Sequence, residues 1–126
     1  MRTLYPFWIS PACRKVRLAL AEKGLKFDLK IEKPWERRHN LLARNPAGEV
    51  PVLVDENDII LSDSQAICEY LDETYEDVPL LPKDRLDRAE ARRLVGWFDR
   101  KFFNEVTDNL VEEKIMKRLT KSGTPN

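Results

Sequence analysis

The order of apolar and polar residues predicts alternating strands and helices over the first part of this chain, residues 1–76. Short apolar runs bounded by turn residues favour strands, and apolar residues spaced three and four apart favour helices. The expected elements are, in chain order, a strand at 3–9, a helix at 11–24, a strand at 27–31, a short helix within 37–44, strands at 52–54 and 59–61, and a helix at 62–75. This β-α-β-α-β-β-α order indicates an α/β fold.

The first helix carries the clearest boundary signals. Ser10 is a preferred N-cap residue, Pro11 suits the first helical position, and Gly24 is typical of a helix end. The apolar face expected between these boundaries consists of Cys13, Val16, Leu18, Ala19 and Leu20.

Residues 45–64 predict a turn, a β-hairpin and a helix start. Asn45–Gly48 has the composition of a turn in which Gly48 takes a positive φ. The two apolar runs enclose Asp55–Asp58, which predicts a hairpin loop of about four residues. Pro51 cannot donate to a sheet, so it belongs at the first position of its strand. We expect a cis Val50–Pro51 bond that turns the Val50 peptide groups outward as an edge for a ligand backbone.

The second part of the chain has a different composition. Asp77–Lys83 contains two prolines and is the expected linker, because neither a strand nor a helix runs comfortably through it. Residues 84–119 are helix formers with many apolar and aromatic side chains, more than one small α/β unit can cover. The polar ending at 121–126 is expected to be frayed or cut, so that the chain is the front part of a longer protein.

Charge and composition exclude several classes of function. The 22 basic and 22 acidic residues cancel, which argues against nucleic-acid binding and against binding to anionic membranes. No apolar stretch is long enough to span a membrane and no signal peptide is present, so a cytoplasmic location is expected. Cys13 and Cys68 are too few for a disulfide framework, and His39, the single histidine, cannot assemble a histidine metal site.

Two helix starts carry candidate chemistry. Ser10 places a hydroxyl at a helix N-terminus, where the dipole lowers the pKa of a nearby thiol. Asp63 and Ser64 offer caps and free N–H groups at another helix start, a place that suits a carboxylate. Each of these residues also fits a plain capping role.

These residues together resemble the glutathione S-transferase superfamily. The resemblance rests on the element order and the linker before a long helix, and on three motifs: Ser10-Pro-Ala-Cys13-Arg-Lys-Val-Arg, Asn45-Pro-Ala-Gly-Glu-Val-Pro51 and Asp63-Ser64-Gln-Ala-Ile67. It implies a thioredoxin-like domain at 1–76, a linker at 77–83, and the first helix of a truncated all-α domain at 84–126. The family also implies a homodimer in the cytoplasm.

The resemblance implies a role for each motif. Ser10 aligns with the residue whose hydroxyl stabilises the glutathione thiolate for attack on an electrophile. Val50, ahead of Pro51, aligns with the residue whose backbone pairs with glutathione, while Ser64 faces the γ-glutamyl carboxylate and Asp63 the ammonium group. Cys13 aligns with the second cysteine of the thioredoxin CxxC pair and Ser10 occupies the first position, so there is no dithiol and thioredoxin-type disulfide exchange is disfavoured. Cys13 is then a reactive thiol or, more often at such a position, a partly buried helix residue.

Glu49 departs from the family pattern. Many members carry Lys or Gln at this position, near the glycyl carboxylate of glutathione, and a carboxylate there repels an anionic tripeptide. Arg37, Arg38, His39 and Lys15 are the candidate compensating charges.

A second interpretation follows from the stretch Lys33-Pro-Trp-Glu-Arg-Arg38, together with Gly48-Glu-Val-Pro51. These residues also resemble a bacterial glutathione S-transferase-like branch linked to cell division, whose members bind filaments of the tubulin homologue FtsZ. The alternative to a glutathione transferase is therefore a noncatalytic interaction protein with the same fold.

Overall fold

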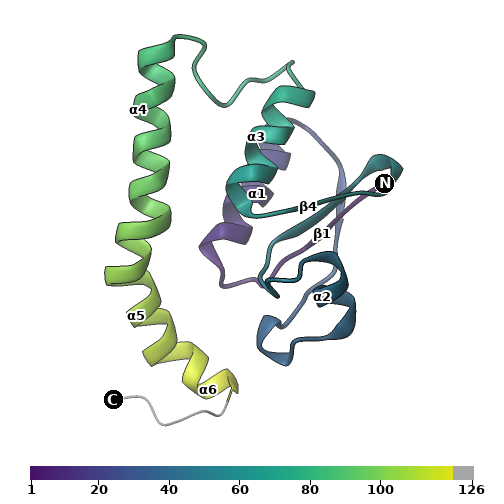
Figure 1. The fold of residues 1–126 in the computed structure, drawn as a ribbon, viewed down its shortest axis with the longest axis vertical. Coiled ribbons are helices and arrows are strands. Elements are labelled where there is room, and N and C mark those ends of the chain that lie inside the picture. Colours follow the sequence, from purple (N-terminus) through teal and green to yellow (C-terminus); the bar gives the residue numbers. More distant parts are fainter. Residues whose placement is uncertain (121–126) are drawn as a thin grey trace. The chain divides into compact units, whose positions relative to one another are not determined.

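The computed structural model describes residues 1–120, which form two compact units. The first unit comprises Met1–Leu80 and the second begins at Leu81 (Figure 1). Each unit is described separately below. The predicted α/β fold, a thioredoxin-like unit followed by a long helix, is confirmed.

The first unit is built on a four-stranded mixed sheet. Its strands are β1 (Arg2–Tyr5), β2 (Phe27–Leu29), β3 (Val52–Asp55) and β4 (Ile59–Ser62), in the spatial order β2-β1-β3-β4. β1 pairs in parallel with β2, while the other two pairs are antiparallel. β1 ends before Pro6, earlier than the apolar run suggests, because proline has no N–H to donate to a ladder.

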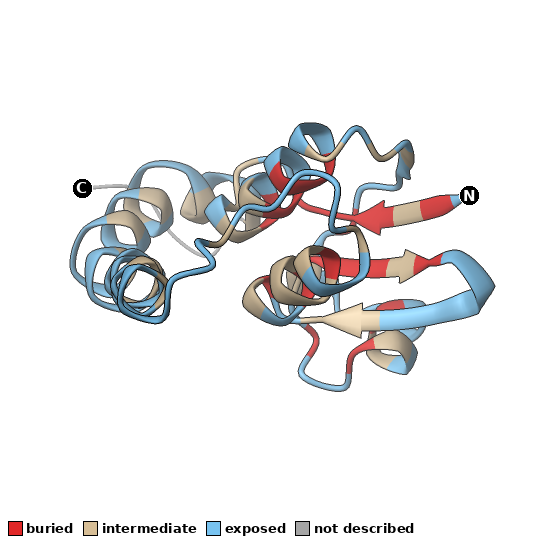
Figure 2. Cartoon of the chain, turned by 90° about the horizontal axis from the view of Figure 1, so that it is seen from above, coloured by how far each residue is buried: buried red, intermediate tan, exposed pale blue. Residues whose placement is uncertain are grey.

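One face of the sheet is covered by α1 (Pro11–Glu22) and α3 (Ser64–Thr74). Leu4 and Leu53 point from the sheet into this layer, and the helices contribute Val16, Leu20, Ile67 and Leu71, all 0% exposed. Burying each such side chain stabilises the fold by about 1.5–3 kcal/mol. Figure 2 shows the buried residues concentrated in β1, β3 and the adjoining helices.

The helical face of α1 differs from its prediction at one position. Cys13, Val16, Ala19 and Leu20 are buried as expected, but Leu18 is 57% exposed. Residues two apart on a helix do not share a face, so Val16 and Leu18 cannot both point into the core. At its C-terminal end α1 has a Schellman motif, in which Gly24 N–H donates to Ala21 O and Leu25 N–H to Leu20 O.

The opposite face of the sheet is covered only in part, by α2 (His39–Arg44). Leu41 of this short helix packs against Tyr5 and Val52. Thr3, Val54 and Ile60 occupy the next row on the same face, two residues farther along the strands.

The hairpin between β3 and β4 has a three-residue loop, because Asp55 pairs with Ile59 and belongs to β3. Asn57 and Asp58 both adopt positive φ, at 63° and 58°. These short polar residues tolerate the left-handed region better than other non-glycine residues. The expected loop of about four residues was therefore one residue too long.

A polar cluster joins the first strand of the unit to the end of α3. Arg2 Nε lies 2.8 Å from Asp55 Oδ1, and the Tyr75 hydroxyl donates to Asp55 Oδ2 at 2.9 Å. The Arg2 guanidinium also lies 4.9 Å from the centre of the Tyr75 ring. Burial and the adjacent Asp55 raise the pKa of the Tyr75 phenol, so Tyr75 remains a neutral donor at physiological pH.

The second unit is one continuous helical rod. Its segments are α4 (Arg85–Gly96), a π-helical stretch (Trp97–Thr107), α5 (Asp108–Val111), a second π-helical stretch (Glu112–Met116) and α6 (Lys117–Thr120). Asp84 caps its start by accepting hydrogen bonds from the N–H groups of Leu86 and Asp87.

No residue of 85–120 is buried. No helix in the described part of the chain is long and apolar enough to cross a membrane. The expectation for residues 121–126 lies outside the described residues.

The first π-helical stretch differs from the α-helix that the sequence predicts. A π-helix is widened to i→i+5 hydrogen bonding. This widening places Trp97 and Phe102, five residues apart, with ring centres 5.6 Å apart, and Phe98 lies 4.9 Å from Trp97. The aromatic contacts along this stretch therefore match the wider helical turn.

Candidate functional site

The strand register brings the predicted site segments to one end of the sheet. Tyr5 pairs with Val52, and Val52 with Ser62, so the end of β1, the start of β3 and the end of β4 meet there. The loop to Ser10 leaves from this end, Pro51 arrives at it, and Asp63 follows it directly. Residues far apart in the sequence thus emerge from the same edge.

Ser10 is the N-cap of α1. Its hydroxyl oxygen accepts the Cys13 N–H at 3.3 Å, and its own N–H donates to Phe7 O at 3.0 Å. The first turn of α1 contains no acidic residue, so the positive end of the helix dipole is not offset. The helix start at Ser10 therefore favours an anionic group such as a thiolate.

Cys13 lies below Ser10 in the core and is 1% exposed. Its sulfur accepts the Phe7 N–H at 3.4 Å. Burial raises the pKa of the Cys13 thiol, although a hydrogen bond with Ser10 opposes that shift. A buried thiol of this kind is a poor nucleophile, which favours the structural interpretation of Cys13.

The Val50–Pro51 bond is cis, as predicted. β3 begins at Val52, so the Val50 peptide groups lie outside its ladder. Among the described residues, neither the Val50 N–H nor its C=O makes a turn, loop or cap hydrogen bond to another backbone group. Val50 thus presents backbone groups that can pair with a ligand.

Asp63 and Ser64 begin α3. Asp63 caps the helix by accepting the Ala66 N–H at 3.2 Å, whereas Ser62, expected in the helix, belongs to β4. The Asp63 backbone has φ 71° and ψ 125°, a conformation that costs a non-glycine residue about 1–3 kcal/mol. Ser64 is only 7% exposed, yet its hydroxyl has no hydrogen-bond partner in the described part of the chain.

The sequence did not predict which charged side chains lie near Glu49. Arg37 lies beside this turn, because a Cβ added to Gly48 would meet Arg37 Nη1 at 3.1 Å. Arg38 instead lies 3.9 Å from Glu32, and Lys15 Nζ donates to Gln65 Oε1. Arg37 has a positive φ of 47°. No glycine or proline at this position indicates such a backbone conformation in the sequence.

An aromatic group flanks the Ser10 loop. Phe7 is buried and contacts Trp35 edge-on, with ring centres 5.0 Å apart. Trp8 stands 5.5 Å from Phe7 and is 60% exposed. An exposed indole beside a candidate site is a common anchor in protein interfaces.

The site can hold an anionic, peptide-like ligand. It offers a helix N-terminus at Ser10, open backbone groups at Val50, and a second helix N-terminus with an unpaired hydroxyl at Ser64. No group of three or more candidate metal ligands occurs among the described residues. The arrangement therefore suits carboxylate and thiolate groups.

Comparison with known proteins gives a consistent result. Residues 4–83 match the sequence model described as glutathione S-transferase, N-terminal domain. The chain is 45% identical to FtsZ-localized protein A of Caulobacter vibrioides, over 99% of this chain and 56% of that protein. A crystal structure of a glutathione S-transferase from Rhodospirillum rubrum is 53% identical with a TM-score of 0.97, over 100% of this chain and 57% of that one.

A second similar structure contains a ligand. It is a glutathione S-transferase from Methylobacterium radiotolerans in complex with glutathione sulfonate, 34% identical with a TM-score of 0.69, over 79% of this chain and 53% of that one. This chain spans a little over half the length of the relatives it matches.

Proposed function

The chain belongs to the glutathione S-transferase family, and from that premise we propose that it binds glutathione and directs its thiolate to an electrophile. The residues proposed to act are Ser10 for the thiolate and Val50, Pro51, Asp63 and Ser64 for the tripeptide. Because the chain spans part of its relatives' length, this proposal concerns the glutathione half of the reaction.

The unpaired Ser64 hydroxyl is the observation that carries the proposal. Ser64 is 7% exposed as a residue, its hydroxyl oxygen still reaches the surface, and among the described residues this oxygen has no hydrogen-bond partner. It stands at the N-terminus of α3, where the first backbone N–H groups are also free. A γ-glutamyl carboxylate would satisfy both kinds of donor, and Asp63 would face the neighbouring ammonium group.

Each remaining residue has a defined task. The Val50 N–H and C=O would pair with the cysteinyl backbone of the ligand. The Ser10 hydroxyl would donate to its sulfur, which together with the α1 dipole favours the thiolate over the thiol. The thiolate forms a carbon–sulfur bond with the electrophile as the leaving group departs. Arg37, beside Gly48, would offset the negative charge that Glu49 brings to the glycyl end.

Titration with glutathione tests the proposal. We expect Ser64→Ala to weaken glutathione binding roughly tenfold, because a hydrogen bond to a charged group is lost. Ser10→Ala should leave affinity nearly unchanged but raise the pKa of the bound thiol, which is read from the ultraviolet thiolate band. Thr74→Ala, at the far end of α3, is the matched control. If millimolar glutathione does not bind and Glu49→Lys leaves that result unchanged, the transferase proposal is wrong.

The aromatic side chains beside the Ser10 loop, Phe7, Trp8 and Trp35, favour a second function. Trp8 is 60% exposed beside the site, and the relative of Caulobacter vibrioides is named for its localisation with FtsZ. The alternative proposal is a noncatalytic protein that binds FtsZ filaments through Trp8 and the loop that contains Trp35.

Cosedimentation with FtsZ filaments tests this alternative. Trp8→Ser should reduce the cosedimenting fraction severalfold without unfolding the chain, because most of the indole is already in solvent. Leu18→Ser, an equally exposed apolar residue on α1, is the control. Equal cosedimentation of wild type and Trp8→Ser would contradict the assignment of the FtsZ-binding surface to Trp8. Glutathione binding is measured in a separate experiment.

A further inference from the structure

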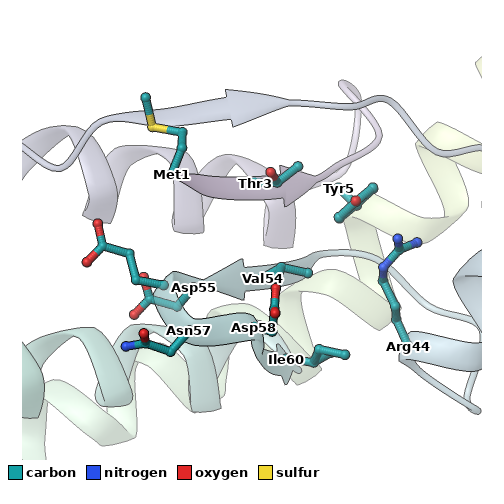
Figure 3. A pocket seen from close by; sticks show the side chains of 10 residues that line it. Met1, Thr3, Tyr5, Arg44, Val54, Asp55, Asn57, Asp58 and Ile60 are labelled. Atoms are coloured by element: carbon teal, nitrogen blue, oxygen red, sulfur yellow. The ribbon is translucent and has the colours of Figure 1, made fainter.

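The partly covered face of the sheet contains a groove of about 690 Å³. Its floor comes from Thr3, Tyr5, Val54 and Ile60, Arg44 of α2 stands at one end, and the β3–β4 hairpin tip, residues 55–58, forms the other (Figure 3). None of the residues proposed to bind glutathione lines it. The groove is therefore a separate candidate site within the first unit.

The Tyr5 end of the groove presents unpaired donors. Arg44 stacks over the Tyr5 ring, with its guanidinium carbon 4.4 Å from the ring centre. Tyr5 is 9% exposed. Among the described residues, its hydroxyl has no hydrogen-bond partner. Arg44 Nη1 donates to Asn40 O at 3.3 Å, and no carboxylate of the described part pairs with this guanidinium. A planar guanidinium beside a hydroxyl donor is suited to a carboxylate.

The hairpin end carries negative charge. Asp55 is already engaged by Arg2 and Tyr75, and Glu56 lies 3.8 Å from Arg2 Nη2. Asp58 is exposed and, within residues 1–120, has no ion-pair partner. In Figure 3, Asp58 is drawn between Asn57 of the hairpin and Arg44. This end therefore favours a cation.

The floor between the two ends is apolar. Thr3 pairs with Val54 and Val54 with Ile60, so these side chains form one row across the sheet. Ile60 is 50% exposed on an edge strand. From the Tyr5–Val52 pair to the Asp55–Ile59 pair the strand advances three residues, so the stretch of β3 under the groove is about 10 Å long.

We propose that this groove binds a small zwitterion with an apolar body, whose carboxylate contacts Arg44 and Tyr5 and whose cationic group contacts Asp58. The apolar body lies on Thr3, Val54 and Ile60. The residues proposed to hold glutathione do not line the groove, although Val50 packs against the cluster that contains Tyr5.

Three probes with the same number of carbon atoms separate the contribution of the carboxylate from that of the cationic group. The zwitterion ω-aminooctanoate carries charges about 10 Å apart when extended at ordinary carbon–carbon bond lengths, octanoate lacks the cation, and octylamine lacks the carboxylate. Each is titrated into the isotope-labelled chain while the backbone amide resonances of Thr3, Val54 and Ile60 are followed. We expect ω-aminooctanoate to bind severalfold more tightly than either single-charge probe, with shifts centred on these residues.

Two variants test the assigned contacts. Arg44→Met should weaken ω-aminooctanoate and octanoate roughly tenfold and leave octylamine unchanged, because the charged hydrogen bonds to the carboxylate are lost. Asp58→Asn should abolish the preference for the zwitterion over octanoate. Arg85→Met and Asp77→Asn, exposed residues outside the groove, are the matched controls. Shifts that spread away from the groove, equal affinities for the three probes, or an Arg44→Met chain that binds ω-aminooctanoate as wild type does would each overturn the proposal.

Discussion

At the residue scale, Glu49 decides how well the candidate site accepts an anionic tripeptide. It is exposed, its carbonyl oxygen accepts a hydrogen bond from Asn45 Nδ2 at 3.0 Å, and Arg37 lies beside the neighbouring Gly48. The turn is therefore held by local hydrogen bonding that does not use the Glu49 side chain. A substitution at Glu49 changes the charge of the site without removing a structural contact.

We expect Glu49→Lys to tighten glutathione binding by up to about fivefold, because a repulsion is replaced by a solvent-screened attraction. The gain should shrink as the ionic strength is raised. Calorimetric titration at low and high salt measures both effects, with Glu22→Lys, at the end of α1, as the control for total charge. A gain of the same size in Glu22→Lys would show that the effect is not local to the site.

At the element scale, a single lysine anchors the segment that follows α3. The Lys23 side chain is 1% exposed, and its Nζ donates to Asp72 Oδ1 at 2.9 Å and to Tyr75 O and Val78 O at 2.8 Å. All three of its N–H donors are thus used. Lys23 also forms the C-cap of α1, so it joins the end of one helix to the chain leaving another.

We predict that Lys23→Met lowers the free energy of unfolding by about 3 kcal/mol, because Asp72 loses its buried cationic partner and two carbonyl groups lose their donor. Urea denaturation followed by circular dichroism gives this value. Lys26→Met removes an exposed lysine three residues away and should change stability by no more than about 0.5 kcal/mol. Equal unfolding midpoints for the two variants would contradict the anchoring role.

At the scale of the whole molecule, the helical rod exposes much of its apolar surface. Phe98 is 55% and Leu110 57% exposed, and no residue between 85 and 120 is buried. We propose that residues 1–76 form one domain, 77–83 a linker, and 84–126 the start of a helical domain. A lone amphipathic helix of this kind gains stability when another surface covers it.

The 126-residue chain should therefore self-associate in solution through the rod. Light scattering over a range of concentrations measures the association. Phe98→Asp should shift the chain toward the monomer, whereas Leu18→Asp, which is 57% exposed on α1 of the first unit, should not. A wild-type chain that stays monomeric at high concentration without binding a dye for apolar surfaces would refute this expectation.

Elements whose signals lie within a few residues of one another could be predicted from the sequence. Ser10, Pro11 and Gly24 mark the two ends of α1 because a capping side chain and a positive φ satisfy backbone groups only a few residues away. The β-α-β-α-β-β-α order and the cis bond before Pro51 also followed from short motifs. The candidate residues Ser10, Val50, Asp63 and Ser64 were named from the sequence for the same reason, although their proposed roles in binding remain predictions.

Contacts between side chains that are distant in the sequence became known from the folded chain alone. The contact of Arg44 with Tyr5 and the approach of Arg37 to Gly48 join residues that no local pattern relates. The cluster of Arg2, Asp55 and Tyr75 depends on the strand register and on the end of α3. The low exposure of Ser64 likewise results from packing around the start of α3. Such features arise from long-range packing and desolvation, whose free energies depend on the folded neighbours rather than on adjacent residues.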